Sequence, residues 1–290
     1  MRTFAAFACI DWSGQAVARP KGLAVACCPA GSAPPELIDA PPGGWSREGI
    51  LAWLTYLARG TADILVGLDL SPALPFVDHR AYFPGLASSP ADARALWALV
   101  DAVSAAEAHL GATLFTEHPL YAPYFRLHGG REGALFGGGA GRFRAVEYRQ
   151  RLAGVSPVSC FNLIGAAQVG KSSLTGMRVL HRLAGRVPIW PFDPVPENGP
   201  LLVEIYTSIA ARAAGVPRGR SKVREPDGLD AALARLGSAP HVPLPRYDDH
   251  ATDAMLTAAW LRAVAIDPAL WSPEGLDAVR LTEGWTFGAR

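Results

Sequence analysis

The stretch Phe7-Ala-Cys-Ile-Asp11-Trp-Ser-Gly14 decides the fold more than any other part of the chain. Residues 3–10 are apolar and lack helix caps, so they predict a buried β-strand. Asp11 follows this run directly. Because α/β sheets bind their ligands at the carboxyl ends of strands, an acid in this position indicates a functional site.

The rest of the chain alternates strand and helix patterns. Further strands are expected at 22–28, 36–39, 64–69, 187–192 and 201–206. Helices are expected after Ser46, at 91–110, 207–214, 228–236 and 250–265, and from Ser272. The first strands are close enough in sequence to pair as a hairpin. We therefore predict an α/β fold: a mixed sheet of about five strands flanked by helices, in one domain over residues 1–290 with an inserted loop and helix region at about 71–160.

Composition restricts the class of protein. Half of the 290 residues are hydrophobic and the formal net charge is +1, so overall charge neither favours nor excludes nucleic acid. The four cysteines form no Cys-x-x-Cys pair, which argues against a zinc knuckle or a disulfide framework. No apolar run approaches the ~20 residues that span a bilayer. We expect a cytoplasmic protein with reduced thiols and no membrane association.

Acidic side chains recur at places comparable to that of Asp11. The candidate ligands and catalytic groups are Asp11, Asp69, Glu204, Asp249, His250 and Asp253. Phosphodiester hydrolysis without a nucleophilic side chain uses divalent cations, and Mg²⁺ or Mn²⁺ prefers carboxylate oxygens. On a helix, His250 and Asp253 are three residues apart and share a face. This set predicts a metal site built from several elements.

Structural roles are open for several of these residues. Asp69 precedes Ser71-Pro72 and is also typical of a turn, and Asp249 also fits an acidic helix cap. Glu204 lies within an apolar run, so it is either paired with an arginine or a metal ligand. Asp253 lies deeper in an apolar helix, where a functional role explains it best.

The same motifs carry a family resemblance. Ile10-Asp11-Trp12-Ser13-Gly14, Gly67-Leu68-Asp69, Val203-Glu204-Ile205-Tyr206, His250-Ala251-Thr252-Asp253-Ala254 and Glu283-Gly284-Trp285-Thr286-Phe287-Gly288 resemble domain-of-unknown-function family 429, whose members are predicted nucleases of RNase H-like fold. The His-x-x-Asp part is similar to the last catalytic helix of RuvC-type resolvases, although Asp249 stands where those proteins have a second histidine. The resemblance implies an RNase H-like core with its metal site at the matched acids.

A second motif indicates a different function. Residues 165–172 fit G-x-x-x-x-G-K-[ST], in which backbone amides cradle phosphates, Lys171 meets phosphate oxygens and Ser172 holds Mg²⁺. Residues 160–164 would supply its strand. Gly176 weakens the following helix, and the next apolar run carries prolines. A glycine-rich turn that opens a helix is the alternative, with Lys171 and Ser172 exposed or contacting a substrate phosphate.

Two segments are rich in arginine. Residues 126–151 carry six arginines around a glycine tract, and residues 212–224 carry five basic side chains. We expect the glycine-rich region at 119–160 to lie outside the core, and its aromatic residues to stack bases unless they form a small cluster of their own. The candidate phosphate ligands are Ser13, Arg142, Arg144, Lys171, Ser172, Arg218 and Arg220.

The leading hypothesis is therefore a nuclease that depends on Mg²⁺ or Mn²⁺ and acts on DNA or RNA by a two-metal mechanism. One alternative is a nucleotide-binding phosphotransferase or ATPase that uses Gly165–Ser172. Another is a non-catalytic scaffold that binds nucleic acid or a protein.

Overall fold

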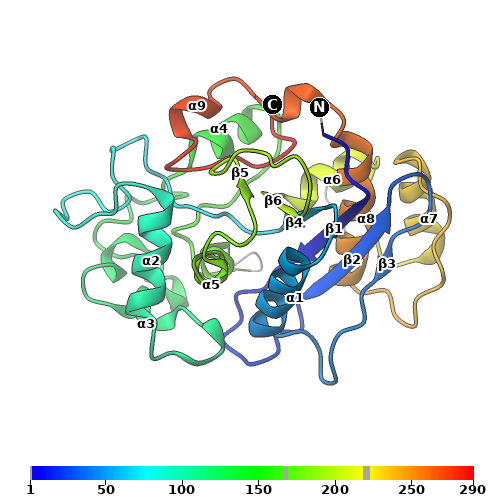
Figure 1. Ribbon diagram of the computed structural model, residues 1–290. Helices are drawn as coiled ribbons and strands as arrows, with labels where there is room; N and C mark the ends of the chain where they lie inside the picture. The colour runs from blue at the N-terminus through cyan, green and yellow to red at the C-terminus, as the bar shows by residue number, and fades with distance from the viewer. Residues whose placement is uncertain (1, 166–168, 218–222) are drawn as a thin grey trace.

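A mixed β-sheet runs through the centre of the molecule (Figure 1). The computed structural model describes residues 2–165, 169–217 and 223–290. Within these ranges the sheet has six strands: β1 (Ala6–Asp11), β2 (Ala24–Pro29), β3 (Glu36–Leu37), β4 (Ile64–Leu68), β5 (Ile189–Trp190) and β6 (Leu201–Glu204). Their order is β3-β2-β1-β4-β6-β5, with β2 antiparallel to both of its neighbours and the other pairs parallel. The predicted α/β class is confirmed.

Helices lie in the connections from β3 to β4 and from β4 to β5, and in the chain after β6. In the described ranges they are α1 (Arg47–Arg59), α2 (Ala93–Val103), α3 (Thr113–Glu117), α4 (Ala145–Leu152), α5 (Val169–Leu183), α6 (Thr207–Ala213), α7 (Pro226–Arg235), α8 (Asp249–Val264) and α9 (Leu276–Val279). Among the described residues, four short 3₁₀ turns cover Ala108–Leu110, Ala122–Tyr124, His128–Gly130 and Pro268–Leu270. Ser46 caps α1 through its side chain, as the sequence predicts.

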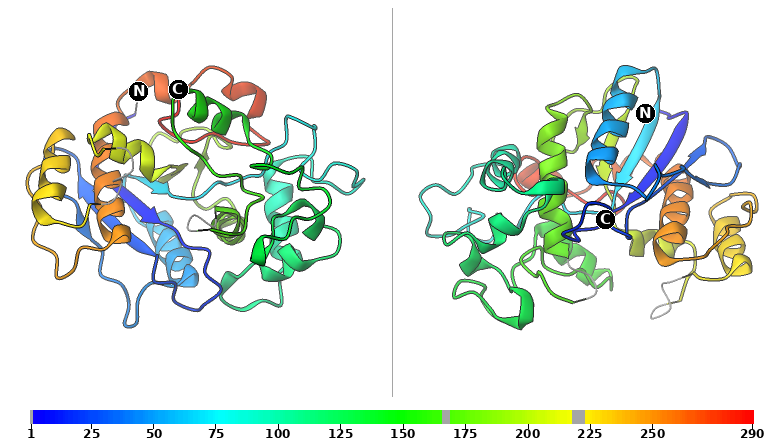
Figure 2. Two further views of the ribbon diagram at one scale, coloured as in Figure 1. Left: turned by 180° about the vertical axis from the view of Figure 1, so that it is seen from behind. Right: turned by 90° about the horizontal axis from the view of Figure 1, so that it is seen from below.

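The central strands are apolar on both faces because helices cover both. Along β1, Ala8 and Ile10 join the core under α1 and α5, whereas Phe7 and Cys9 join the core under α8. This period of two follows from strand geometry, in which successive side chains point to opposite faces. Figure 2 shows α1 and α8 on opposite sides of the sheet. The fully apolar run of β1 is typical of a strand buried in this way.

Gly67 lets α8 lie close to β4. A Cβ atom at this position would come within 2.8 Å of Leu261 Cδ1 and 2.9 Å of Ile205 Cγ2. Ordinary contacts between carbon atoms are 3.5–4.0 Å. The missing side chain therefore sets the spacing between helix and sheet, and with it the height of the α8 side chains above the strand ends.

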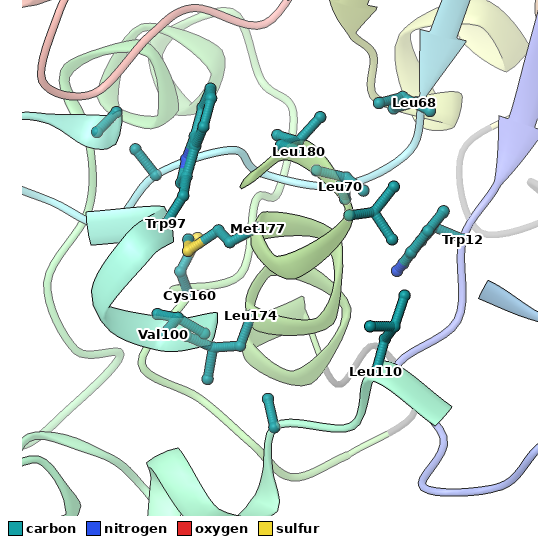
Figure 3. Close-up of a cluster of buried hydrophobic side chains, with 14 of the residues drawn as sticks. Trp12, Leu68, Leu70, Trp97, Val100, Leu110, Cys160, Leu174, Met177 and Leu180 are labelled. Atoms are coloured by element: carbon teal, nitrogen blue, oxygen red, sulfur yellow. The ribbon is translucent and has the colours of Figure 1, made fainter. Parts of the chain in front are cut away.

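The region between β4 and α5 packs into the main core. Figure 3 shows Leu174 and Met177 of α5 near Trp97 and Val100 of α2, with Trp12 on the other side of α5. Among the buried aromatic side chains of this region are Phe83, Phe115, Tyr121, Tyr124, Phe125, Phe136 and Phe143. The expectation that residues 119–160 lie outside the core, with aromatics that stack bases, is therefore wrong. Apolar burial accounts for these rings instead.

Within the described ranges, no helix has both the length and the apolar character needed to cross a bilayer.

Candidate active site

Asp11 and Asp69 lie side by side because β1 and β4 are parallel neighbours. Ile10 is in register with Leu68, and the backbone N–H of Asp69 donates to the carbonyl oxygen of Ile10 at 3.0 Å. The residues that follow Ile10 and Leu68 are Asp11 and Asp69, which therefore lie at the same edge of the sheet. Since Ile10 and Leu68 point toward α1 and α5, both aspartates point toward α8.

The first turns of α8 bring two further groups to this edge. His250 Nδ1 lies 2.7 Å from Oδ2 of Asp11. Asp253 is one turn further along and is 7% exposed, similar to Asp11 at 6%. Asp248 caps the helix by accepting a hydrogen bond from the N–H of Ala251. The helix N-terminus favours negative charge nearby, so the local backbone supports this acidic arrangement.

These groups line a cavity of about 500 Å³. Asp11, Asp69, Asp253 and His250 all contribute to its wall. The size falls within the usual range for small-molecule and cofactor sites. The structure thus brings these four predicted site residues into one cavity, from three elements that are far apart in sequence.

The electrostatics of Asp69 reflect this crowding. Desolvation raises the pKa of its carboxyl well above the ordinary value, and the nearby carboxylates of Asp11 and Asp253 raise that pKa further. Thr207, the first residue of α6, opposes the shift weakly by donating from its N–H and its hydroxyl to the two Asp69 oxygens, at 3.4 Å each. Like charges held together in this way favour a bound proton or a cation.

Glu204 lies in the same cavity wall but is bound to Arg144. The guanidinium donates to both Glu204 oxygens, at 2.5 and 2.9 Å, and the hydroxyl of Thr286 donates to Oε1 at 2.7 Å. Arg144 is 1% exposed and also binds Glu147 at 2.9 Å. Of the two roles open to Glu204, the structure places it in the ion pair.

The register of β6 explains this outcome. Glu204 pairs with Leu68, one residue before the level of Asp69. Its side chain therefore points to the α5 side, opposite to Asp11 and Asp69. Burial alone would lower the pKa of Arg144, but the carboxylates of Glu204 and Glu147 outweigh it and raise that pKa well above its usual value. Desolvation raises the pKa of Glu147 despite this partner.

The other predicted ligands lie elsewhere. Asp249 forms a two-pronged ion pair with Arg224, at 2.7 and 2.9 Å, next to the cavity that His250 lines. Arg142 is paired with Asp78 at 2.6 Å and donates to nearby carbonyl oxygens. Arg142 and Arg144, expected to bind phosphate, both have internal carboxylate partners, and Arg144 also lines the cavity, so their contact with phosphate stays a prediction. Arg218 and Arg220 lie outside the described residues.

Hydrogen bonds from buried side chains tie the loop after β1 to its neighbours beside the cavity. Arg47 is buried and donates to the carbonyl oxygens of Ser13, Gln15 and His109, at 2.8–3.2 Å. Trp12 donates from its indole to Thr175 of α5 at 3.1 Å. Ser13 lines the cavity, and its contact with a substrate stays a prediction.

The phosphate-loop motif is only partly described, since residues 166–168 lie outside the described ranges. Residues 160–164 form no strand of the sheet, so that expectation is wrong. Lys171 and Ser172 lie in the first turn of α5, and Ser172 lines the cavity. A Cβ on Gly14 would come within 2.4 Å of the Lys171 and Ser172 backbone, so glycine allows the β1 loop to contact this helix.

Sequence reasoning missed two contributors. Thr207 holds Asp69, and Arg47 holds the loop at 13–15. Thr207 begins α6 three residues after the end of β6, and this position shortly after a strand was the available signal. No sequence signal marks Arg47, because its partners are carbonyl oxygens of distant segments.

The donor chemistry fits a hard divalent cation. The carboxylates of Asp11, Asp69 and Asp253 line one cavity, where desolvation and then their mutual repulsion raise the pKa of Asp69, and a cation would relieve both. In the part of the chain that the structure describes, no three His, Cys, Asp or Glu side chains form a ready-made ligand cluster. Mg²⁺ commonly takes one or two carboxylates and fills its remaining positions with water and substrate phosphate.

Comparisons of the chain with known proteins found no match. No family model, no curated protein and no solved structure matches the chain.

Proposed function

We propose that the protein is a metal-dependent nuclease with an RNase H-like core and that Asp11, Asp69 and Asp253 would hold Mg²⁺ or Mn²⁺. The observation that carries the proposal is the convergence of these carboxylates in one cavity, from the ends of two parallel strands and the start of α8. The strand order β3-β2-β1-β4-β6-β5, a mixed sheet with an antiparallel start, supports the RNase H-like core that the family resemblance implies.

Hydrolysis of a phosphodiester joins a water oxygen to phosphorus and breaks the bond from phosphorus to the leaving oxygen. Divalent ions, when bound, neutralise charge on the phosphate and lower the pKa of the attacking water. The attacking water releases a proton, and the leaving oxygen must gain one. His250 lies at the solvent side of the cavity, with its side chain 46% exposed and Asp11 holding the imidazole in place, so it is suited to move that proton.

The two alternatives have less support. A nucleotide-binding ATPase would need residues 160–164 as the strand before its loop, and these residues are not in the sheet. A non-catalytic scaffold would not require three carboxylates to share a cavity at a cost in electrostatic free energy. Perturbed carboxyl groups in a cavity are typical of functional sites.

The experiment is hydrolysis of a small chromogenic phosphodiester and of DNA and RNA, single-stranded and duplex, with Mg²⁺, Mn²⁺ or EDTA. We expect hydrolysis that requires the metal and falls by about 100-fold or more in Asp253→Asn. Asp39→Asn changes an exposed aspartate after β3 and is the matched control. Activity that persists in EDTA, or at the wild-type level in Asp253→Asn, would overturn the proposal.

A further inference from the structure

A second hollow of about 740 Å³ lies beside the carboxylate cavity, and His250 lines both. Its walls come from the β1–β2 loop, from residues 40–45 and from the segment that leads into α8. We call it the basic groove. Because His250 lines both, the groove adjoins the edge of the sheet that carries the carboxylates.

The basic groove is positively charged. Four cationic side chains line it against two acids: Arg19, Lys21, Arg224 and Arg246 against Asp248 and Asp249. Asp249 is paired with Arg224, and Asp248 caps α8. Across the described ranges, neither Lys21 nor Arg246 forms an ion pair, and both are exposed. Since the whole chain has a net charge of only +1, this excess of positive charge is local.

We propose that the basic groove holds the phosphate backbone of a single-stranded nucleic acid, adjacent to the phosphate that enters the carboxylate cavity. The inference rests on the proposed function, because it names the substrate of that same site. The three carboxylates repel a polyanion, so flanking cations must supply much of its affinity. Lys21 and Arg246 are placed to do so.

The depth of the catalytic carboxylates favours a single strand over a duplex. Asp11 and Asp253 are 6% and 7% exposed, so the cleaved phosphate must enter a recess. Duplex DNA is stiff, with a persistence length of about 50 nm, whereas a single strand bends readily. Tyr247 also lines the groove, and its hydroxyl lies 2.8 Å from Nε2 of His241, which fixes the ring. A fixed aromatic ring is a suitable platform for a base.

The test is binding of a fluorescent oligothymidylate, measured by anisotropy in Ca²⁺ at several salt concentrations. We expect Lys21→Gln and Arg246→Gln each to raise the Kd about three- to tenfold. Each should also reduce the slope of log Kd against the logarithm of the salt concentration by about 0.7. Arg59→Gln removes an exposed arginine at the far end of α1 and should bind as wild type does. Thymidine monophosphate should compete weakly, because it cannot occupy both cavities.

Three results would overturn the inference: wild-type Kd values in both groove variants, equal competition by the mononucleotide, or tighter binding of a duplex of the same length. Hydrolysis of the small diester is read separately. Binding that depends on Lys21 and Arg246 without any hydrolysis would refute the nuclease and leave the groove standing. Hydrolysis of the diester, together with wild-type Kd values in both groove variants, would refute the groove and leave the nuclease standing.

Discussion

His250 Nδ1 lies 2.7 Å from the carboxylate of Asp11, although 239 positions separate the two residues in sequence. The contact joins the end of the first strand to the first turn of α8. Because α8 packs along the sheet, the same contact brings Asp253 beside the strand ends. The beginning and the last third of the chain therefore build one site.

Asp69→Asn should make the protein more stable and less active. The raised pKa of Asp69 arises from desolvation and from repulsion by Asp11 and Asp253, and an amide removes both penalties. We expect the melting temperature in EDTA at neutral pH to rise by about 2 °C or more. Calorimetry on this variant and on Asp39→Asn checks the prediction.

The sign of the pH dependence follows from the raised pKa of Asp69. The wild type loses stability as pH rises through the folded-state pKa of this carboxyl, because the folded protein then holds an unfavourable charge. The advantage of Asp69→Asn should therefore grow with pH and vanish below the unfolded-state pKa of about 3.9. A variant that is less stable than wild type at neutral pH would contradict this interpretation.

Glu204→Gln should reduce stability while leaving Mn²⁺ binding in place. Arg144 is buried and depends on Glu204 for two of its hydrogen bonds, so the change leaves guanidinium charge poorly compensated. We expect a loss of about 3 kcal/mol in the free energy of unfolding. Denaturant titration checks it, with the exposed Glu197→Gln as the control. Unchanged stability with loss of Mn²⁺ binding would instead make Glu204 a metal ligand.

Gly67→Ala should loosen the packing of α8 on the sheet. The added Cβ would come within 2.8 Å of Leu261 Cδ1, which predicts a cost of about 1–3 kcal/mol and weaker metal binding. Leu261→Val removes the obstructing atom. The double variant should therefore lose less free energy of unfolding than the two single variants lose together, as measured by a double-mutant cycle. Strictly additive effects would show that the contact does not limit the position of the helix.

Asp101→Asn should destabilise the protein at neutral pH but not in strong acid. Burial acts to raise the pKa of Asp101, but Arg178 and Arg182 outweigh it and lower that pKa. A depressed folded-state pKa gives stability that is complete above the unfolded value of about 3.9 and is lost as pH falls through the folded value. The variant leaves the fully buried Arg178 without this carboxylate, so we expect the free energy of unfolding to fall by about 3 kcal/mol at pH 7. Urea titrations across this pH range should give free energies of unfolding for the variant and the wild type that become equal at the acid end.

The α/β class and most elements could be predicted from local pattern. Apolar runs bounded by glycine and proline located β1, β2, β4 and β6, and the cap at Ser46 located α1. The convergence of Asp11 and Asp69 was also accessible, because parallel strands end at one edge of a sheet, and the spacing of His250 and Asp253 indicated one face of a helix.

The partners of the arginines could not be predicted in this way. Whether Glu204 faces Asp69 or Arg144 depends on a one-residue difference in strand register, which only pairing in three dimensions specifies. Arg144 and Arg142 lie beside a glycine-rich tract that is typical of a mobile loop, yet long-range ion pairs hold them inside. The basic groove combines Lys21 with Arg246, which are distant in sequence and carry no motif.

The most direct measurement is calorimetric titration of Mn²⁺ into wild type, Asp11→Asn, Asp253→Asn and the control Asp39→Asn. If the two ends of the chain form one metal site, the wild type and the control bind Mn²⁺, and each site variant loses at least about tenfold in affinity. Wild-type affinity for Mn²⁺ in both Asp11→Asn and Asp253→Asn would contradict the shared metal site.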